Sequence, residues 1–217
     1  MSLPLPRNTP TASEISSTLP PSRRRFFQLS ALSGVGVLAL SACASNDSLA
    51  RQANAGDNKN FIAGDGSVAQ YAINERKEPV VLAGKLFDGT AVSSTAWAGK
   101  VVVLNFWYAA CSPCRLEAPR LEALYQEFKA DGVLFYGVNI RDREPEAAAF
   151  ERTFGVTYPS MEDSGGGVLL AMTQYVPPQA VPTTLVLDKA GRVASRILGL
   201  ADQGTLKALI ADAVAGK

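Results

Sequence analysis

Residues 101–107 read VVVLNFW, a run of aliphatic, β-branched and aromatic side chains in which both faces of a strand are apolar. Such a strand belongs in the centre of a sheet. The leucines and the phenylalanine of residues 116–128 recur at helical spacing, and Gly132 ends that pattern. A second apolar run follows at Val133–Asn139. A strand, a helix and a parallel strand in this order form a right-handed crossover unit, so we expect an α/β fold.

Strand and helix patterns alternate through the rest of the C-terminal part, as in other α/β domains. Pro119 lies inside the helix that follows the first strand and should kink it. The other expected elements are a hairpin or loop at 79–86 with a turn at Asp88–Gly89, a helix at 145–154, an extended piece at 158–161, a helix at 167–175, a hairpin of 183–187 with 192–198, and a closing helix at 202–214.

The first 42 residues have the pattern of an export signal. Arginines at 23–25 precede an uncharged run from Phe26 to Ala42, which resembles the twin-arginine signature. The run ends in Leu-Ser-Ala-Cys, which resembles the lipoprotein cleavage box, so we expect Cys43 to be acylated. An uncleaved N-terminal helix with a chance cysteine is the alternative. We therefore expect a signal peptide at 1–42, a polar, flexible tether at 43–74 and a folded domain at 75–217.

Charge gives no reason to expect a nucleic acid as the partner. The full chain carries 21 basic and 20 acidic residues. Removal of residues 1–42 takes away four basic residues and one acidic residue, which leaves 17 and 19 and a net charge of −2. A balance this close to neutral lacks the basic excess of proteins that bind nucleic acids or acidic membrane surfaces.

Two of the three cysteines, Cys111 and Cys114, lie two residues apart directly after the first strand. A structural zinc site needs four ligands, and the chain contains no histidine, so carboxylates would have to complete it. We therefore expect no metal here. A structural disulfide is the second alternative, but closing so small a loop removes little entropy from the unfolded chain. Redox turnover is the third interpretation, and it suits an exported protein.

The position of the pair favours redox turnover. Cys111 lies between the carboxyl end of the expected strand and the first turn of the helix, where free backbone N–H groups and the helix dipole favour a thiolate. Pro113 suits a first helical turn because it lacks an N–H donor that would go unused there. Cys114 is one turn further in and should be the shielded, resolving thiol. The expected redox centre is therefore the Cys111–Cys114 disulfide itself, without another cofactor.

The motifs GKVVVLNFW, NFWYAACSPCRLEAP and, far downstream, VPTTLVLDKAGRV occur in this order. Together they resemble the thioredoxin-fold TlpA/ResA-like thiol-disulfide oxidoreductases, many of which are membrane-anchored and serve cytochrome c maturation. The resemblance covers about residues 75–217. It implies a thioredoxin fold, with a central mixed sheet flanked by helices, an N-terminal strand extension and an insertion after the second core strand.

The resemblance also implies roles for individual residues. Cys111 would attack the substrate disulfide, and Cys114 would resolve the mixed disulfide. Glu117 would handle protons beside the cysteines, although a solvent-facing acid near the helix start is an equal alternative. Pro182 would be the cis-proline that faces the cysteines, with its backbone and that of Val181 pairing with a substrate chain; a trans loop proline is the alternative.

Three further positions bear on the expected site. Trp107 would shape the rim and contact substrate, although a core aromatic at a strand end is equally ordinary. Ala110 stands where the family often has tryptophan, which should leave the sulfur of Cys111 more open. Asn105 stands where cytoplasmic thioredoxins have a buried aspartate, which points to Glu117 for proton transfer.

These features predict a lipid-anchored reductase on the extracytoplasmic face of the cell membrane. Its clients would be exported disulfide-containing proteins, and the resemblance implies apocytochrome c. A membrane thiol carrier would supply the electrons, and we expect a monomer. The alternatives are a thiol oxidase that donates disulfides, a redox-silent binding lipoprotein, and a copper chaperone, which the absence of histidine disfavours.

Overall fold

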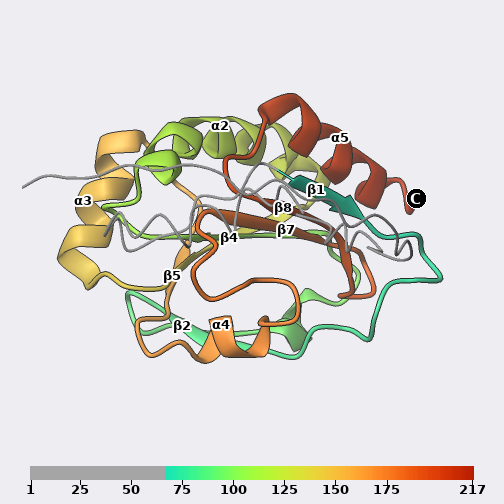
Figure 1. Cartoon of the computed structure of the whole chain (residues 1–217), viewed down its shortest axis with the longest axis horizontal. Helices are drawn as coiled ribbons and strands as arrows, with labels where there is room; N and C mark the ends of the chain where they lie inside the picture. Colours follow the sequence, from blue (N-terminus) through green and yellow to red (C-terminus); the bar gives the residue numbers. More distant parts are fainter. Residues whose placement is uncertain (1–66) are drawn as a thin grey trace, which may run out of the picture. The chain divides into compact units, whose positions relative to one another are not determined.

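The computed structural model describes residues 67–217, which form an eight-stranded mixed sheet with helices on both faces (Figure 1). Along the chain, the helices and strands are β1 (Ser67–Gln70), β2 (Ala83–Leu86), β3 (Ala91–Ser93), β4 (Val102–Trp107), α2 (Ser112–Phe128), β5 (Leu134–Asn139), α3 (Glu144–Phe154), β6 (Ser160–Glu162), α4 (Gly167–Ala171), β7 (Thr183–Leu187), β8 (Val193–Leu198) and α5 (Gln203–Val214). The order of the strands across the sheet is β1-β8-β7-β4-β5-β6-β2-β3.

Strand β4 is the central strand that the sequence predicts. All six of its residues are buried, which explains why neither face of the strand carries a charged side chain. It pairs in parallel with β5, where Val102 lies opposite Leu134, and antiparallel with β7, where Val102 lies opposite Leu187. The predicted crossover unit is therefore present, and it carries the segment between β4 and α2 to one end of the sheet.

Each face of the sheet is covered by a different set of helices. Helices α2 and α5 lie on one face and α4 on the other (Figure 1). On the first face, the leucines of α2 and α5 pack with Val103 of β4 and Val186 of β7. On the other face, Val168 and Met172 pack with Trp97. The 3.6-residue periodicity of the helices and the two-residue periodicity of the strands together produce these two cores.

Helix ends follow local signals in the sequence. The side chain of Asp202 caps α5 by accepting a hydrogen bond from the N–H of Thr205 at 2.9 Å. Helix α3 has Pro145 in its first turn and ends at Gly155, whose φ is 69°. Helix α4 is shorter than expected: it ends at Ala171, and the chain continues in turns towards the two prolines at 177–178, which cannot extend a helix.

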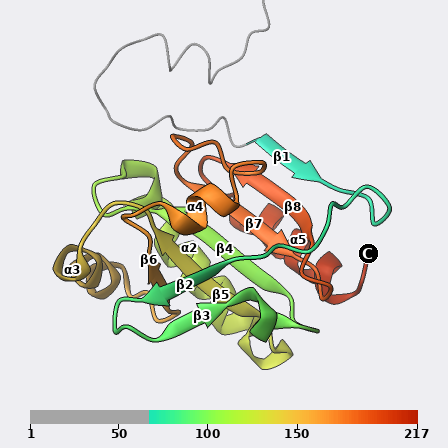
Figure 2. The same ribbon diagram turned by 90° about the horizontal axis from the view of Figure 1, so that it is seen from below.

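The N-terminal part of the described chain forms both edges of the sheet (Figure 2). The β2–β3 hairpin forms one edge, and of the hairpin or loop that the sequence leaves open here the structure has the hairpin. Strand β1 forms the other edge by pairing antiparallel with β8, so that Ser67 lies opposite Leu198. The expectation of a tether as far as residue 74 is therefore wrong, because residues 67–70 belong to the sheet. Their sequence, SVAQ, has too little apolar alternation to predict a strand.

Candidate functional site

Cys111 and Cys114 form a disulfide at the start of α2, and their Cα atoms are 5.3 Å apart. Cys111 is the cap residue of the helix, and its sulfur accepts a hydrogen bond from the N–H of Cys114 at 3.3 Å. The N–H of Cys111 donates to the carbonyl of Tyr108 at 3.1 Å, which closes a turn directly after β4. The sulfur of Cys111 therefore sits at a helix N-terminus, where free N–H groups stabilise negative charge.

The disulfide is buried, which corrects the expectation that Ala110 leaves the sulfur of Cys111 open. Cys111 has 0% and Cys114 has 1% of its surface exposed. Both belong to an apolar cluster with Phe150 of α3 and Val181. The sequence around the cysteines does not reveal this cover, because Phe150 comes from the insertion between β5 and α4, about 40 residues later in the chain.

Trp107 lies beneath the site instead of at its rim. Its side chain is 3% exposed, and its ring packs against that of Phe150 with the centroids 4.3 Å apart. The expected position at the rim is therefore corrected, because α3 covers the indole. Trp107 and the cysteines belong to the same apolar cluster, so the indole reports on the surroundings of the disulfide.

The peptide bond between Val181 and Pro182 is cis, as the resemblance implied. Val181 is buried in the same cluster as the cysteines. The carbonyl of Pro182 accepts a hydrogen bond from the N–H of Gly199 at 2.7 Å. The cis bond therefore lies beside the redox pair.

Glu117, one helical turn after Cys114, is a buried acid and not a solvent-facing one. It is 1% exposed, and both carboxylate oxygens accept hydrogen bonds. One oxygen accepts from Nδ2 of Asn105 at 2.7 Å, and the other accepts from the N–H of Ala201 at 3.0 Å. Nδ2 of Asn105 also donates to the hydroxyl of Thr184 at 3.1 Å. The carboxyl group is thus held in place by Asn105 of β4, which is itself bonded to β7, and by the loop before α5.

Burial determines how Glu117 titrates. Loss of solvation favours the neutral acid and raises the pKa of Glu117 to about 7, although the hydrogen bonds from Ala201 and Asn105 and the charge of Arg120 act in the opposite direction. A carboxyl group with a pKa near neutrality takes up and releases protons at physiological pH, as general acids and bases do.

Sequence reasoning missed Asn139, the last residue of β5, and Asp142, which lies in the turn that follows. The N–H of Ala109, two residues before Cys111, donates to Oδ2 of Asp142 at 2.5 Å. Polar residues at the carboxyl end of a strand in a parallel pair are the signal that could have identified them, because β4 and β5 end side by side.

A small pocket of about 200 Å³ opens beside the cysteines, between the start of α2 and α3. Arg115, Phe150 and Phe154 contribute to its wall, and the guanidinium of Arg115 lies 5.7 Å from the ring centroid of Phe154. This pocket adjoins the redox pair because Ala109 also lines it.

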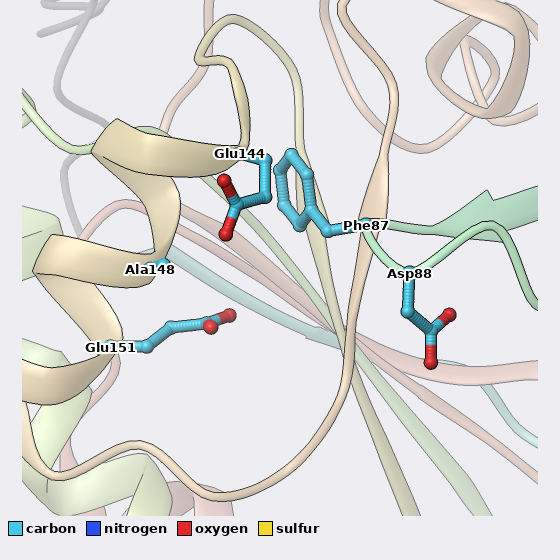
Figure 3. A pocket seen from close by; sticks show the side chains of 5 residues that line it. All are labelled: Phe87, Asp88, Glu144, Ala148 and Glu151. Atoms are coloured by element: carbon cyan, nitrogen blue, oxygen red, sulfur yellow. The ribbon is translucent and has the colours of Figure 1, made fainter.

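A larger pocket of about 360 Å³ lies between the β2–β3 turn and α3, and its walls carry three carboxyl groups. Figure 3 shows Glu144 beside the ring of Phe87 and Glu151 extending from α3 into the space between the two segments. Within residues 67–217, no three histidine, cysteine, aspartate or glutamate side chains are grouped closely enough to hold a metal ion. The carboxyl groups of this pocket therefore do not form a metal site.

Comparison with known proteins agrees with this geometry. Residues 78–196, more than half of the chain, match the AhpC/TSA family. The chain belongs to the AhpC/TSA family. One relative in sequence is the thiol-disulfide oxidoreductase ResA of Geobacillus thermodenitrificans, 35% identical over 120 residues, which are 55% of this chain and 67% of that protein. ResA of Bacillus subtilis is 32% identical over 112 residues, which are 52% of this chain and 60% of that protein.

Solved structures of thioredoxin-fold proteins superpose on most of the described chain. A DsbF homologue from Corynebacterium diphtheriae has a TM-score of 0.60 and 31% identity, and the match covers 69% of this chain and 94% of that one. A secreted thiol-disulfide isomerase from Corynebacterium glutamicum has a TM-score of 0.61 and 28% identity, with 71% and 96% covered. The predicted thioredoxin fold and the predicted class, thiol-disulfide oxidoreductases with a CxxC active site, are confirmed.

Cys43 and the expected signal peptide lie outside the described residues, so the predicted lipid anchor stays a prediction. No helix in the described part of the chain, from residue 67 onwards, is long and apolar enough to cross a membrane.

Proposed function

We propose that this chain is a lipid-anchored thiol-disulfide reductase that acts on the extracytoplasmic face of the cell membrane. The observation that carries the proposal is the arrangement of three groups within one site. The Cys111–Cys114 pair begins α2, the cis Val181–Pro182 bond lies in the same cluster, and Glu117 lies one turn beyond the pair.

The reaction is a two-electron exchange. The thiolate of reduced Cys111 attacks one sulfur of a client disulfide, and the other client sulfur leaves as a thiolate that takes up a proton. The thiolate of Cys114 then attacks the sulfur of Cys111 in the mixed disulfide. The second client sulfur leaves and is protonated, and the Cys111–Cys114 bond closes. The client gains two electrons and two protons, and the enzyme loses them.

Glu117 would serve as the base for the second step. Cys114 must lose its proton before it attacks, and it is buried, so water has little access to it. Burial raises the pKa of Glu117 to about 7, which makes its carboxylate a proton acceptor near neutral pH. Glu117 and Cys114 are three residues apart on α2 and therefore share one side of the helix.

The client chain would bind along the cis-proline segment. The backbone of Val181, which is in the same cluster as the cysteines, would pair with the client backbone as in strand addition and bring the client disulfide against Cys111. Pairing through the backbone requires an extended client segment and does not depend on particular client side chains. This suits a reductase that serves several exported proteins, with apocytochrome c as the client that the family resemblance suggests.

The location and the partners rest on the N-terminal sequence. The arginine pair and the Leu-Ser-Ala-Cys box predict export and acylation of Cys43. The secreted neighbour from Corynebacterium glutamicum supports an extracytoplasmic site of action. A membrane thiol carrier would return electrons to the pair after each cycle. We further propose that the protein acts as a monomer and binds no nucleic acid.

The equilibrium reduction potential of the Cys111–Cys114 pair tests this proposal. The purified protein is titrated against thiol buffers of defined potential, and the fluorescence of Trp107 reports the state of the pair. The Cys111→Ser variant, which cannot form the disulfide, is the control for unrelated changes in fluorescence. A potential near that of thioredoxin, about −270 mV, supports a reductase.

Two other results contradict the proposal. A potential near that of the oxidase DsbA, about −120 mV, would reverse the direction and make the protein a disulfide donor. A pair that does not interconvert at any buffer potential would instead indicate a redox-silent binding lipoprotein.

A further inference from the structure

The turn after β5 contacts the segment that leads into Cys111, residue by residue. The N–H of Ile140 donates to the carbonyl of Trp107 at 3.1 Å. The guanidinium of Arg141 lies over the ring of Tyr108, 4.1 Å from its centroid. The N–H of Ala109 donates to Asp142, the next residue of the turn. Three successive residues, 140–142, therefore each contact one of three successive residues, 107–109.

Asp142 makes the last of these contacts. Its Oδ2 accepts from the N–H of Ala109 at 2.5 Å and from Nδ2 of Asn139 at 2.9 Å. Asn139 is completely buried, and its Oδ1 accepts from the N–H of Arg141 at 3.1 Å and from the N–H of Asp142 at 2.8 Å. The amide of Asn139 therefore fixes both the turn and the carboxylate that reaches across to the loop.

The carboxylate matters because of where Ala109 lies in the chain. Cys111 is held by a hydrogen bond from its own N–H to the carbonyl of Tyr108. The turn that positions the sulfur of Cys111 therefore begins at Tyr108, and the segment after β5 contacts Tyr108. Without the carboxylate of Asp142 as acceptor, the half-buried N–H of Ala109 would have no hydrogen-bond partner, and the start of the turn would no longer be bonded to the segment after β5.

We propose that Asp142 is a positioning residue for Cys111. It acts through Ala109, and it links the inserted segment of α3 and β6 to the redox pair. The insertion would thus contribute to thiol-disulfide exchange by fixing the loop before Cys111. It contacts this loop from the side of β5, whereas the cis-proline lies on the other side of β4, next to β7. The inference rests on the proposed function, because it assumes that Cys111 is the attacking thiol.

Two variants distinguish the effect of the position of the Asp142 carboxylate on the reaction rate from the effect of its charge. Both hydrogen bonds end on the same oxygen, so the amide oxygen in Asp142→Asn can accept both while the charge is lost. Asp142→Glu keeps the charge but moves the carboxylate by one methylene group. We expect Asp142→Glu to lower the second-order rate constant of the reduced protein with the small disulfide DTNB about tenfold, and Asp142→Asn to stay within about twofold of the original.

The outcomes are distinct. Loss of rate in the Asn variant equal to that in the Glu variant would overturn the positioning role, because the Asn variant keeps the acceptor oxygen in place and loses only its charge. A Glu variant as fast as the original would also overturn it. Urea unfolding of the same samples ensures that folded protein is compared, and Asp131→Asn, at an exposed acid after α2, controls for removal of a charge elsewhere. If the original protein itself does not react with DTNB, the proposed function fails, and not this inference alone.

Discussion

Glu117 shows how the fold changes the chemistry of a single residue. The sequence places it one turn beyond Cys114, where it could equally have faced solvent. The packing of α2 on the sheet turns it inwards, against Asn105 of β4 and the N–H of Ala201. The energy of desolvation outweighs these hydrogen bonds and raises the pKa of the carboxyl group to about 7.

We predict that Glu117 makes the stability of the oxidised protein depend on pH between about 5 and 7.5. The pKa is higher in the folded state than in the unfolded chain, so the folded state binds more protons in this range, and stability falls as pH rises. The fall between pH 5.5 and 7.5 should be about 2 kcal/mol, and Glu117→Gln should remove it. Urea unfolding at the two pH values measures the difference.

Glu127→Gln is the matched control for this experiment. Glu127 lies on the same helix but is exposed, and it pairs with Lys207 at the surface. Its replacement should leave the slope with pH as it is. An unchanged slope in Glu117→Gln would mean that the buried carboxyl group is not the source of the pH dependence.

The sequence predicts the site at some residues and not at others. The cysteine pair follows from its spacing at the start of a helix, and the family resemblance implies Glu117 and the cis form of Pro182. Asp142 does not, because its partner, the N–H of Ala109, comes from a segment 33 residues earlier, and a contact between two loops leaves no periodic pattern. The burial of Cys111 was missed for the same reason.

At the scale of elements, the structure differs most from the sequence-based prediction at the edge of the sheet. The central strands follow from their apolar runs, and α3 and α5 follow from their caps and periodicity. Strand β1 does not, because its four residues are mostly exposed and their strand conformation depends on the neighbouring β8. Tertiary pairing, not local propensity, determines this element.

We predict that removal of β1 weakens the domain and exposes a sheet edge. A chain that begins at residue 75 loses the four paired positions of β1 and the hydrogen bond from the N–H of Tyr71 to Ala194. Its free energy of unfolding should be lower by about 2 kcal/mol than that of a chain that begins at residue 60. Because β8 then has an unpaired edge, the shorter chain should also associate at high concentration.

Urea unfolding and light scattering of the two chains measure these effects. Equal stability and equal monomer content in both chains would show that β1 contributes nothing to the fold. The comparison keeps the redox site unchanged, since both chains contain every residue of β4, α2 and β7.

At the scale of the whole molecule, the proposed anchor can be tested by changing Cys43 alone. We predict that Cys43→Ala shifts the protein from the membrane fraction to the soluble extracytoplasmic fraction, because a chain without the acyl groups keeps no stable hold on the bilayer. Ser45→Ala, just after the cleavage box, should leave the protein in the membrane fraction. Retention of Cys43→Ala in the membrane would instead support an uncleaved N-terminal helix.

The pairing of the strands also determines which end of the domain meets the tether. Ser67 lies opposite Leu198, Leu198 lies opposite Thr183, and Thr183 lies opposite Phe106, one residue before β4 ends. The chain therefore enters the sheet at the end from which the cysteine loop leaves it. With Cys43 acylated as proposed, the attachment point and the redox pair share one pole of the domain. Tension in the tether would then turn that pole towards the bilayer, where the proposed membrane thiol carrier would meet it.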